Sequence, residues 1–288
     1  MTMQKLILSF SVVIFISSCS INSLVIRQMT PILQNSAQAV YEESDLDLAE
    51  KALAANLKLI DGLLKSDPDN EELLLMAAQG YAGYALGFLE DVQPARAKVL
   101  YLRARDYALR ILHADKRFIT AENSGLAKFE EHLQSCIKDK AAALFWTGFA
   151  WSGFINLSVD DAAAVADLPL VQVIMKRVEE LDPGYYYGSV YIFWGSLYGM
   201  KPKMMGGDPH KAGEYFNKNF ELNKTRFLLA YVYAARFHAA ALLDEELFDT
   251  YIKQVLETPA DIYPEVRLLN EIAKVKAEYL KKKKDDLF

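Results

Sequence analysis

The sequence predicts an all-α protein built from tetratricopeptide-like helical repeats, an α-solenoid that contains no sheet. Three observations lead to this prediction. Apolar residues recur at helical spacing over most of the chain, prolines close successive helices, and small and aromatic residues occupy the packing positions of a roughly 34-residue repeat. A single helix pair of this kind cannot bury its own apolar face, so each pair is expected to have neighbours of the same kind.

The clearest repeat lies within Leu181–Phe220. Its uncharged segment Tyr185–Met200 has the length of a buried helix, and the run Gly206-Gly207-Asp208-Pro209 breaks the chain before a second helix opens. Counted from Pro183 as the closing proline, the packing positions of the two helices fall on Ile192, Phe193, Ala212 and Phe216. This segment is therefore expected to be one complete helix-turn-helix unit.

Earlier repeats follow the same pattern. Apolar residues at helical spacing run from Asp45 to a stop at Pro68, and the next helix places Leu74, Ala77, Ala78 and Tyr81 at packing positions. Its partner is expected over Pro94–Ala114. The more polar stretch Thr120–Cys136 is predicted to be a linking helix.

The third unit begins in Ala141–Val159, a stretch without charge. Its length would also suit a membrane span, but its polar and glycine interruptions and its repeat spacing favour a buried helix. Phe227–Leu243 and Glu246–Leu256 form the last predicted pair, and Pro264–Lys284 is predicted to be a capping helix with charge on its outer face.

The N-terminus has the features of a bacterial lipoprotein signal. Lys5 precedes the apolar run Leu6–Ile16, which is too short to span a bilayer, and small residues lead to Cys19. We therefore expect a signal peptide over residues 1–18, lipidation of Cys19, and a tether over 19–40 in which a short helix docks. Residues 41–288 form the repeat domain. The alternative is an ordinary secretory signal, and in both cases the chain leaves the cytoplasm.

Several stretches together resemble one family, the T-component of tripartite ATP-independent periplasmic (TRAP) transporters, also called TatT-like proteins. They are SDLDLAEKALAANLKLIDGLLKSDPDNEELLLMAAQGYAGYALGF (Ser44–Phe88), YLRARDYALRIL (Tyr101–Leu112), ALFWTGFAWSGFINLS (Ala143–Ser158) and KMMGGDPHKAGEYF (Lys203–Phe216). The resemblance implies an all-helical lipoprotein of cryptic tetratricopeptide repeats that forms a homotrimer with a central pore. It also implies a partner, the substrate-binding P-component of the transporter, and a hydrophobic or organic-acid ligand handed to it.

Catalytic chemistry is not expected. The sequence contains no GxSxG or HExxH motif and no glycine-rich phosphate loop after a strand, so we predict no enzyme, no catalytic residue and no cofactor. His132 and Cys136 are spaced to share a helix face, but two ligands do not make a zinc site, and no metal is expected. The net charge of −6 has no basic stripe, which argues against nucleic acid as a partner.

Aromatic residues supply the candidate binding surface. They are concentrated on the first helices of the repeats, at Tyr81, Tyr84, Phe88, Trp146, Trp151, Tyr185, Tyr186, Tyr187, Phe193, Trp194 and Tyr198. Most are expected in the core, and the rest could line a concave groove. The residues predicted to face a ligand or partner are Tyr81, Tyr84, Trp151, Trp194, Tyr198, Lys203, Met204 and Met205. Lys203, Met204 and Met205 lie in a predicted loop, and the alternative interpretation is that this loop is only a linker between repeat helices.

The functional hypothesis is a scaffold on the periplasmic face of the envelope, anchored by lipid and associated with a TRAP transporter. Ser20 after the cysteine, in place of an aspartate, favours the outer membrane over the inner one. The alternative is a repeat lipoprotein that serves envelope or outer-membrane protein assembly.

Overall fold

The computed structural model describes residues 25–288, and over these residues the chain is helical and contains no β-strand. The all-α prediction is therefore confirmed for this part of the chain. The predicted signal peptide (1–18) and the predicted lipidation site, Cys19, lie outside the described residues.

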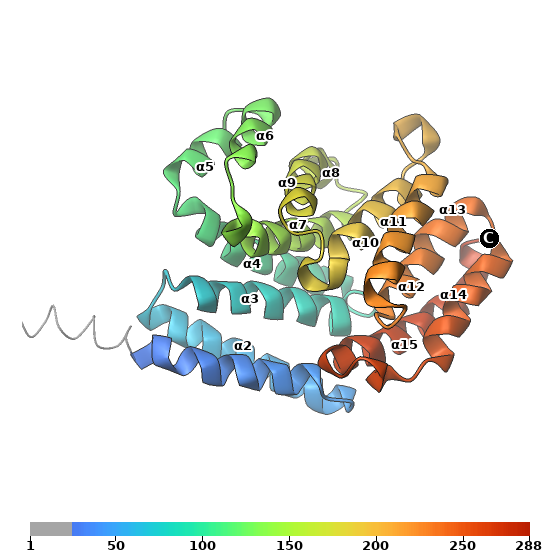
Figure 1. The fold of residues 1–288 in the computed structure, drawn as a ribbon, viewed down its shortest axis with the longest axis horizontal. Coiled ribbons are helices and arrows are strands. Elements are labelled where there is room, and N and C mark those ends of the chain that lie inside the picture. Colours follow the sequence, from blue (N-terminus) through green and yellow to red (C-terminus); the bar gives the residue numbers. More distant parts are fainter. Residues whose placement is uncertain (1–24) are drawn as a thin grey trace, which may run out of the picture.

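The first half of the molecule is a stack of helices in chain order (Figure 1). In the series α2, α3, α4, α7 and α9, each helix packs against the next. The helices are α2 (Leu46–Ser66), α3 (Glu71–Tyr84), α4 (Pro94–His113), α5 (Lys116–Glu122), α6 (Leu126–Gln134), α7 (Ala141–Asn156), α8 (Ala162–Ala166) and α9 (Leu168–Leu181).

The second half begins at the long helix α10 and ends with the C-terminal helix (Figure 1). Helix α10 packs on α11, and α12, α14 and α15 all contact one another. The helices are α10 (Tyr185–Met200), α11 (Pro209–Asn223), α12 (Leu229–Ala234), α13 (Ala240–Leu242), α14 (Glu245–Glu257) and α15 (Arg267–Lys282).

Local sequence signals explain where these helices start. A side-chain oxygen just before the first turn accepts a backbone N–H that has no partner within the helix. Six of the described helices have such a cap, from Asp45, Asn70, Asp115, Asp161, Asp208 and Asp244. Proline, whose fixed φ suits the first turn, opens α4 and α11.

Two five-residue π-helical turns interrupt longer helices. η1 (Ala85–Leu89) continues α3, and η4 (Ala235–Ala239) joins α12 to α13. Each extra residue shifts the helix face by part of a turn, and such turns occur often at functional sites. The predicted helix Phe227–Leu243 is thus a run of three segments.

One predicted helix is wrong. Thr120–Cys136 was expected to be a single linking helix, whereas the chain forms α5 and α6 with a break between them. Gly125 lies at this break with φ of 96°, a value that helices exclude and glycine accepts without steric cost.

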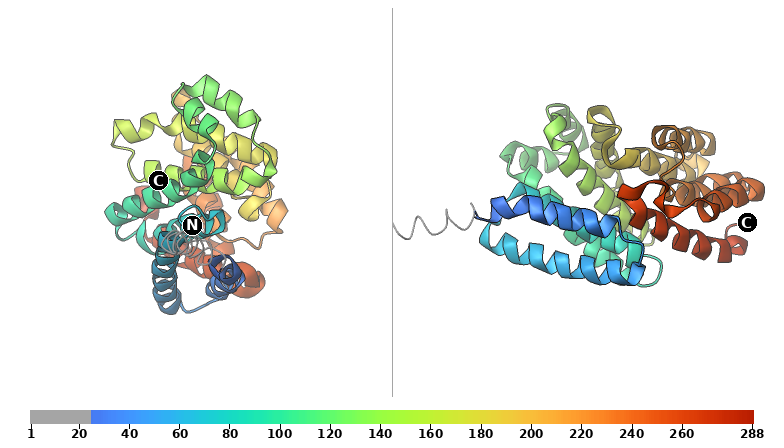
Figure 2. Two further views of the ribbon diagram at one scale, coloured as in Figure 1. Left: turned by 90° about the vertical axis from the view of Figure 1, so that its left-hand side faces the viewer. Right: turned by 60° about the horizontal axis from the view of Figure 1, so that its bottom comes forward.

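The N-terminal helix, residues 25–41, packs along α2 (Figure 2, right). Ile26, Leu33 and Val40 are buried, and the Gln79 side chain donates a hydrogen bond of 2.7 Å to the Tyr41 hydroxyl. This segment is therefore part of the core of the described structure.

The two ends of the helical stack meet. Helix α15 contacts α2, and the Ile272 side chain lies against Gly87 in η1. Lys276 of α15 forms ion pairs with the residues that follow η1. The core is consequently continuous from the first helices to the last.

Candidate functional site

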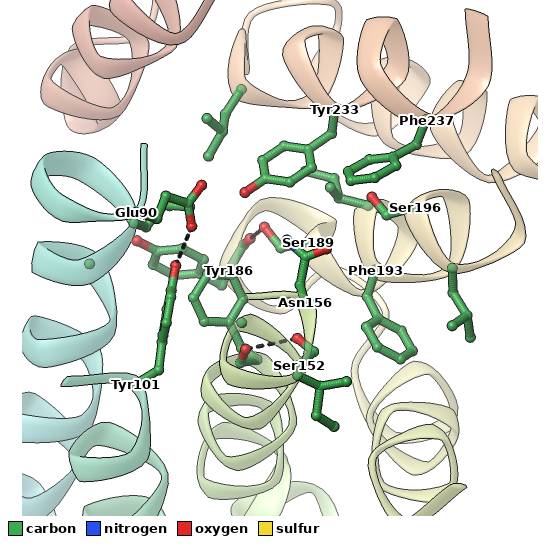
Figure 3. Close-up of a pocket in the computed structure, with 18 of the residues that line it drawn as sticks. Glu90, Tyr101, Ser152, Asn156, Tyr186, Ser189, Phe193, Ser196, Tyr233 and Phe237 are labelled. Atoms are coloured by element: carbon green, nitrogen blue, oxygen red, sulfur yellow. Dashed lines mark hydrogen bonds between the residues drawn. The ribbon is translucent and has the colours of Figure 1, made fainter. Parts of the chain in front are cut away.

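A cavity of about 130 Å³ lies where the two halves of the molecule meet (Figure 3). Its walls come from η1 and α4, from α7, from α10, and from α12 and η4. An engineered cavity of roughly 150 Å³ in another protein stays dry and binds benzene. The space is therefore large enough for one ring or a short alkyl chain.

Aromatic side chains form most of the wall. Ring faces of this kind bind apolar ligands through burial of area and through stacking. The aromatic lining residues are Tyr101, Trp146, Phe149, Tyr186, Phe193, Phe227, Tyr233 and Phe237.

A carboxylate, Glu90, lies at one end of the cavity beside Tyr101 (Figure 3). The Tyr101 hydroxyl donates a hydrogen bond of 2.6 Å to Glu90 Oε2. Lys276 Nζ lies 2.7 Å from Glu90 Oε1 and 2.6 Å from Asp91 Oδ2. The side chains of Lys276, Glu90 and Asp91 are 7%, 10% and 24% exposed, so this ion cluster is largely shielded from water.

The cluster keeps its lysine charged. Burial alone would lower the pKa of Lys276, but the adjacent Glu90 and Asp91 outweigh burial, and the pKa is raised. Burial raises the pKa of the Tyr101 and Tyr233 hydroxyls well above the ordinary value of 10.0, and the negative charge of Glu90 adds to the effect. Both tyrosines are therefore neutral hydrogen-bonding groups at neutral pH.

Small polar side chains interrupt the apolar wall. The Ser152 hydroxyl donates to the Phe149 carbonyl at 2.8 Å, and the Ser189 hydroxyl donates to the Tyr186 carbonyl at 2.7 Å. The Ser196 hydroxyl is buried and has no hydrogen-bond partner among the described residues. A buried hydroxyl without a partner loses stabilisation that a bound polar group can restore.

The backbone at the start of α10, beside the cavity-lining Tyr186, has three successive residues in the left-handed region. Tyr186, Tyr187 and Gly188 have φ of 45°, 60° and 64°. The amides of Asn219 and Asn223 donate to the Tyr187 carbonyl at 2.8 and 2.9 Å. These hydrogen bonds hold a conformation that costs roughly 1–2 kcal/mol for each residue other than glycine.

None of the eight surface residues predicted from the sequence lines this cavity. Tyr81 and Tyr84 are buried, and their hydroxyls bond to Asp61 at 2.6 Å and Glu50 at 3.0 Å. Trp151 is buried as well, and its indole N–H donates to Asp167 at 3.3 Å.

The other five predicted residues lie on or near the outside of the second half. Trp194 is buried beneath the α10–α11 surface, and Tyr198 stacks on Tyr215 with ring centres 5.8 Å apart. Lys203, Met204 and Met205 lie in the loop that projects from the body between α10 and α11 (Figure 1). Met204 is 99% exposed and Met205 is 68% exposed.

The polar residues of the cavity were missed, although the sequence carries a signal for them. Ser152 and Asn156 are four residues apart on α7, and Ser189 and Ser196 are seven apart on α10, so each pair shares one helix face. Ser152 and Asn156 were interpreted as interruptions of an apolar helix, and no role was predicted for Ser189 and Ser196. On these two helices the repeated polar positions lie on the side that faces the cavity.

Within residues 25–288, no helix is both long and apolar enough to cross a membrane. A comparison with curated proteins finds no match. The family model for the TRAP transporter T-component matches residues 42–288, nearly the whole chain. Members of this family are accessory proteins of a transporter in the cell envelope and are not known as enzymes. The chain belongs to the TRAP transporter T-component family.

Proposed function

We propose that this T-component is a periplasmic lipoprotein scaffold that binds the P-component of a TRAP transporter and holds a hydrophobic ligand for transfer. The observation that carries the proposal is the aromatic cavity at the centre of a chain of this family. A purely structural spacer has no need for an apolar cavity between its helices, because unfilled apolar space lowers stability.

The shape of the cavity supports the ligand part of the proposal. Its aromatic walls favour an apolar molecule, and its size suits one ring. The left-handed segment and both π-helical turns adjoin the wall, and irregular backbone of this kind is common at binding sites.

The loop after α10 supports the partner part. Met204 and Met205 expose flexible apolar side chains next to Lys203, and methionine adapts to irregular protein surfaces. We propose this loop as the docking surface for the P-component. Burying one methionine side chain contributes about 1.5–3 kcal/mol.

Three further features belong to the proposal. Helix pairs stacked in chain order act as tetratricopeptide-like repeats, the protein forms a homotrimer, and lipid on Cys19 holds it to the envelope, with the outer membrane favoured. Several acyl chains, at about 0.8 kcal/mol per buried methylene, would bind firmly to a membrane.

The test is a pull-down of a TRAP transporter P-component from the same organism, with the T-component as bait. We expect a complex, and we expect the double variant Met204→Ser/Met205→Ser to weaken it at least about tenfold. The control is Val159→Ser, which removes an exposed apolar side chain, 62% accessible, in a different loop, between α7 and α8. Absence of a complex, or recovery only of outer-membrane assembly factors from the envelope, would refute the proposal and favour the assembly role.

A further inference from the structure

The charged side chains around the cavity indicate which charge a bound ligand carries. We propose that the cavity binds a small apolar amine, with its ammonium group at Glu90, and rejects the matching carboxylate. This inference rests on the proposed function in one respect, that the cavity holds a ligand. It goes beyond that function because it assigns the charge of the ligand.

The first argument is the inventory of charged groups in the wall. Among the described residues that line the cavity, none is a lysine, arginine or histidine, and Glu90 is the single carboxylate. A carboxylate ligand would lose its water, find no cation, and face a like charge. An organic acid is therefore the least favourable occupant.

The second argument is the charge of the cluster at Glu90. Two carboxylates, Glu90 and Asp91, share the one ammonium group of Lys276, which leaves one negative charge in excess. Lys276 touches both acids and is not among the cavity-lining residues. A second cation on the cavity side of Glu90 would balance this charge.

Other charged groups lie outside. An outer recess that shares Glu90 with the cavity is also lined by Arg236, Lys283 and Asp286. These three side chains are exposed, so water and salt screen them from the cavity interior. Their charges consequently change the potential at the cavity wall much less than the buried Glu90 does.

The third argument is the distribution of aromatic rings. Tyr101, Tyr186 and Tyr233 lie around Glu90, and the Tyr233 hydroxyl is turned towards it (Figure 3). Ring faces attract ammonium groups, most strongly where water is excluded, and carboxylates gain nothing from them. Aromatic faces and a buried carboxylate together form a recognised environment for amines.

The test compares three probes of one shape: benzylamine, benzyl alcohol and benzoate. Residues 20–288, which include the whole described structure, are titrated with each probe by calorimetry at neutral pH. We expect benzylamine to bind at least about tenfold more tightly than benzyl alcohol, and benzoate to bind more weakly than both. Glu90→Gln should remove the preference for the amine.

Asp91→Asn is the matched control. It removes the same charge and the other hydrogen bond to Lys276, but Asp91 does not line the cavity, so the preference for benzylamine should persist. If Glu90→Gln does not fold, the three probes on the unaltered protein still decide.

Equal binding of alcohol and amine would overturn the inference and leave a neutral hydrophobic site. Benzoate binding as tightly as benzylamine would overturn it in favour of an acid. No binding of any probe would overturn both the inference and the ligand-holding part of the proposed function, whereas the pull-down tests the partner part independently.

Discussion

Replacing Lys276 with methionine should destabilise the protein strongly. The substitution keeps an unbranched side chain but removes the ammonium group that lies 2.7 Å from Glu90 and 2.6 Å from Asp91. Two shielded carboxylates would then face each other without a cation. Removing one partner from a buried ion pair costs roughly 3–5 kcal/mol, and the 24% exposure of Asp91 places the expected loss near the lower end, about 3 kcal/mol.

Urea unfolding followed by tryptophan fluorescence measures this loss. With a slope of about 1–3 kcal/mol per molar urea, the midpoint should fall by about 1–3 M at neutral pH. The matched control is Lys253→Met, which breaks an exposed pair with Glu257 and should cost less than about 0.5 kcal/mol. Adding Asp91→Asn to the Lys276 variant should recover part of the loss, because it removes one of the two unpaired carboxylates.

The pH dependence of the stability is a second test of the Lys276 ion pairs. Folding raises the pKa of Lys276, so its stabilising contribution is complete below 10.5 and is lost as the pH rises past the raised value. The variant and the parent protein should therefore converge in stability only at strongly alkaline pH. A loss below about 1 kcal/mol at neutral pH would refute the reasoning, since it would mean that the carboxylates reach water when the lysine is absent.

Three further predictions concern the cavity and the left-handed backbone beside it. Gly188→Ala should destabilise the protein by at least about 1 kcal/mol, because the new Cβ would lie 2.5 Å from Leu222 at a φ of +64°. The control, Gly62→Ala, meets no atom within 4 Å and should stabilise the protein, and thermal melts compare the two variants. Ser196→Ala should leave stability unchanged or raise it by up to about 1 kcal/mol in urea, and a clear loss would reveal a missed hydrogen bond. Burial raises the pKa of three cavity tyrosines, Tyr101, Tyr186 and Tyr233, above 10.0. The stability of the protein should therefore fall as the pH rises above 10.0, and the absorbance of these tyrosinates should appear only when the protein unfolds.

Helix positions could be predicted from the sequence wherever proline, glycine and capping residues marked the ends. The predicted segment Tyr185–Met200 has the bounds of α10, although its first turn is left-handed at Tyr186–Gly188, and Pro209 opens α11 as expected. The split between α5 and α6 was missed because one glycine with positive φ, Gly125, breaks a stretch whose composition still suits a helix.

The cavity could not be predicted in the same way. Helices α7 and α10 are apolar on nearly all sides, so periodicity does not indicate which face is turned inwards. The wall also combines residues as distant in sequence as Glu90, Trp146 and Tyr233. Aromatic content pointed to α3, α7 and α10, yet the helix packing buries Tyr81 and Trp151 away from the cavity.

The contact between α15 and η1 affects how the whole chain comes apart. A row of helix pairs with free ends can fray from either terminus, one pair at a time. Here Lys276 and Ile272 hold the last long helix against the turn after α3, so α15 cannot separate without breaking contacts with the first half of the chain. Removing α15 by truncation would therefore lower stability by more than the loss of one helix, because α15 also contributes Leu269 to the cavity wall and contacts α2.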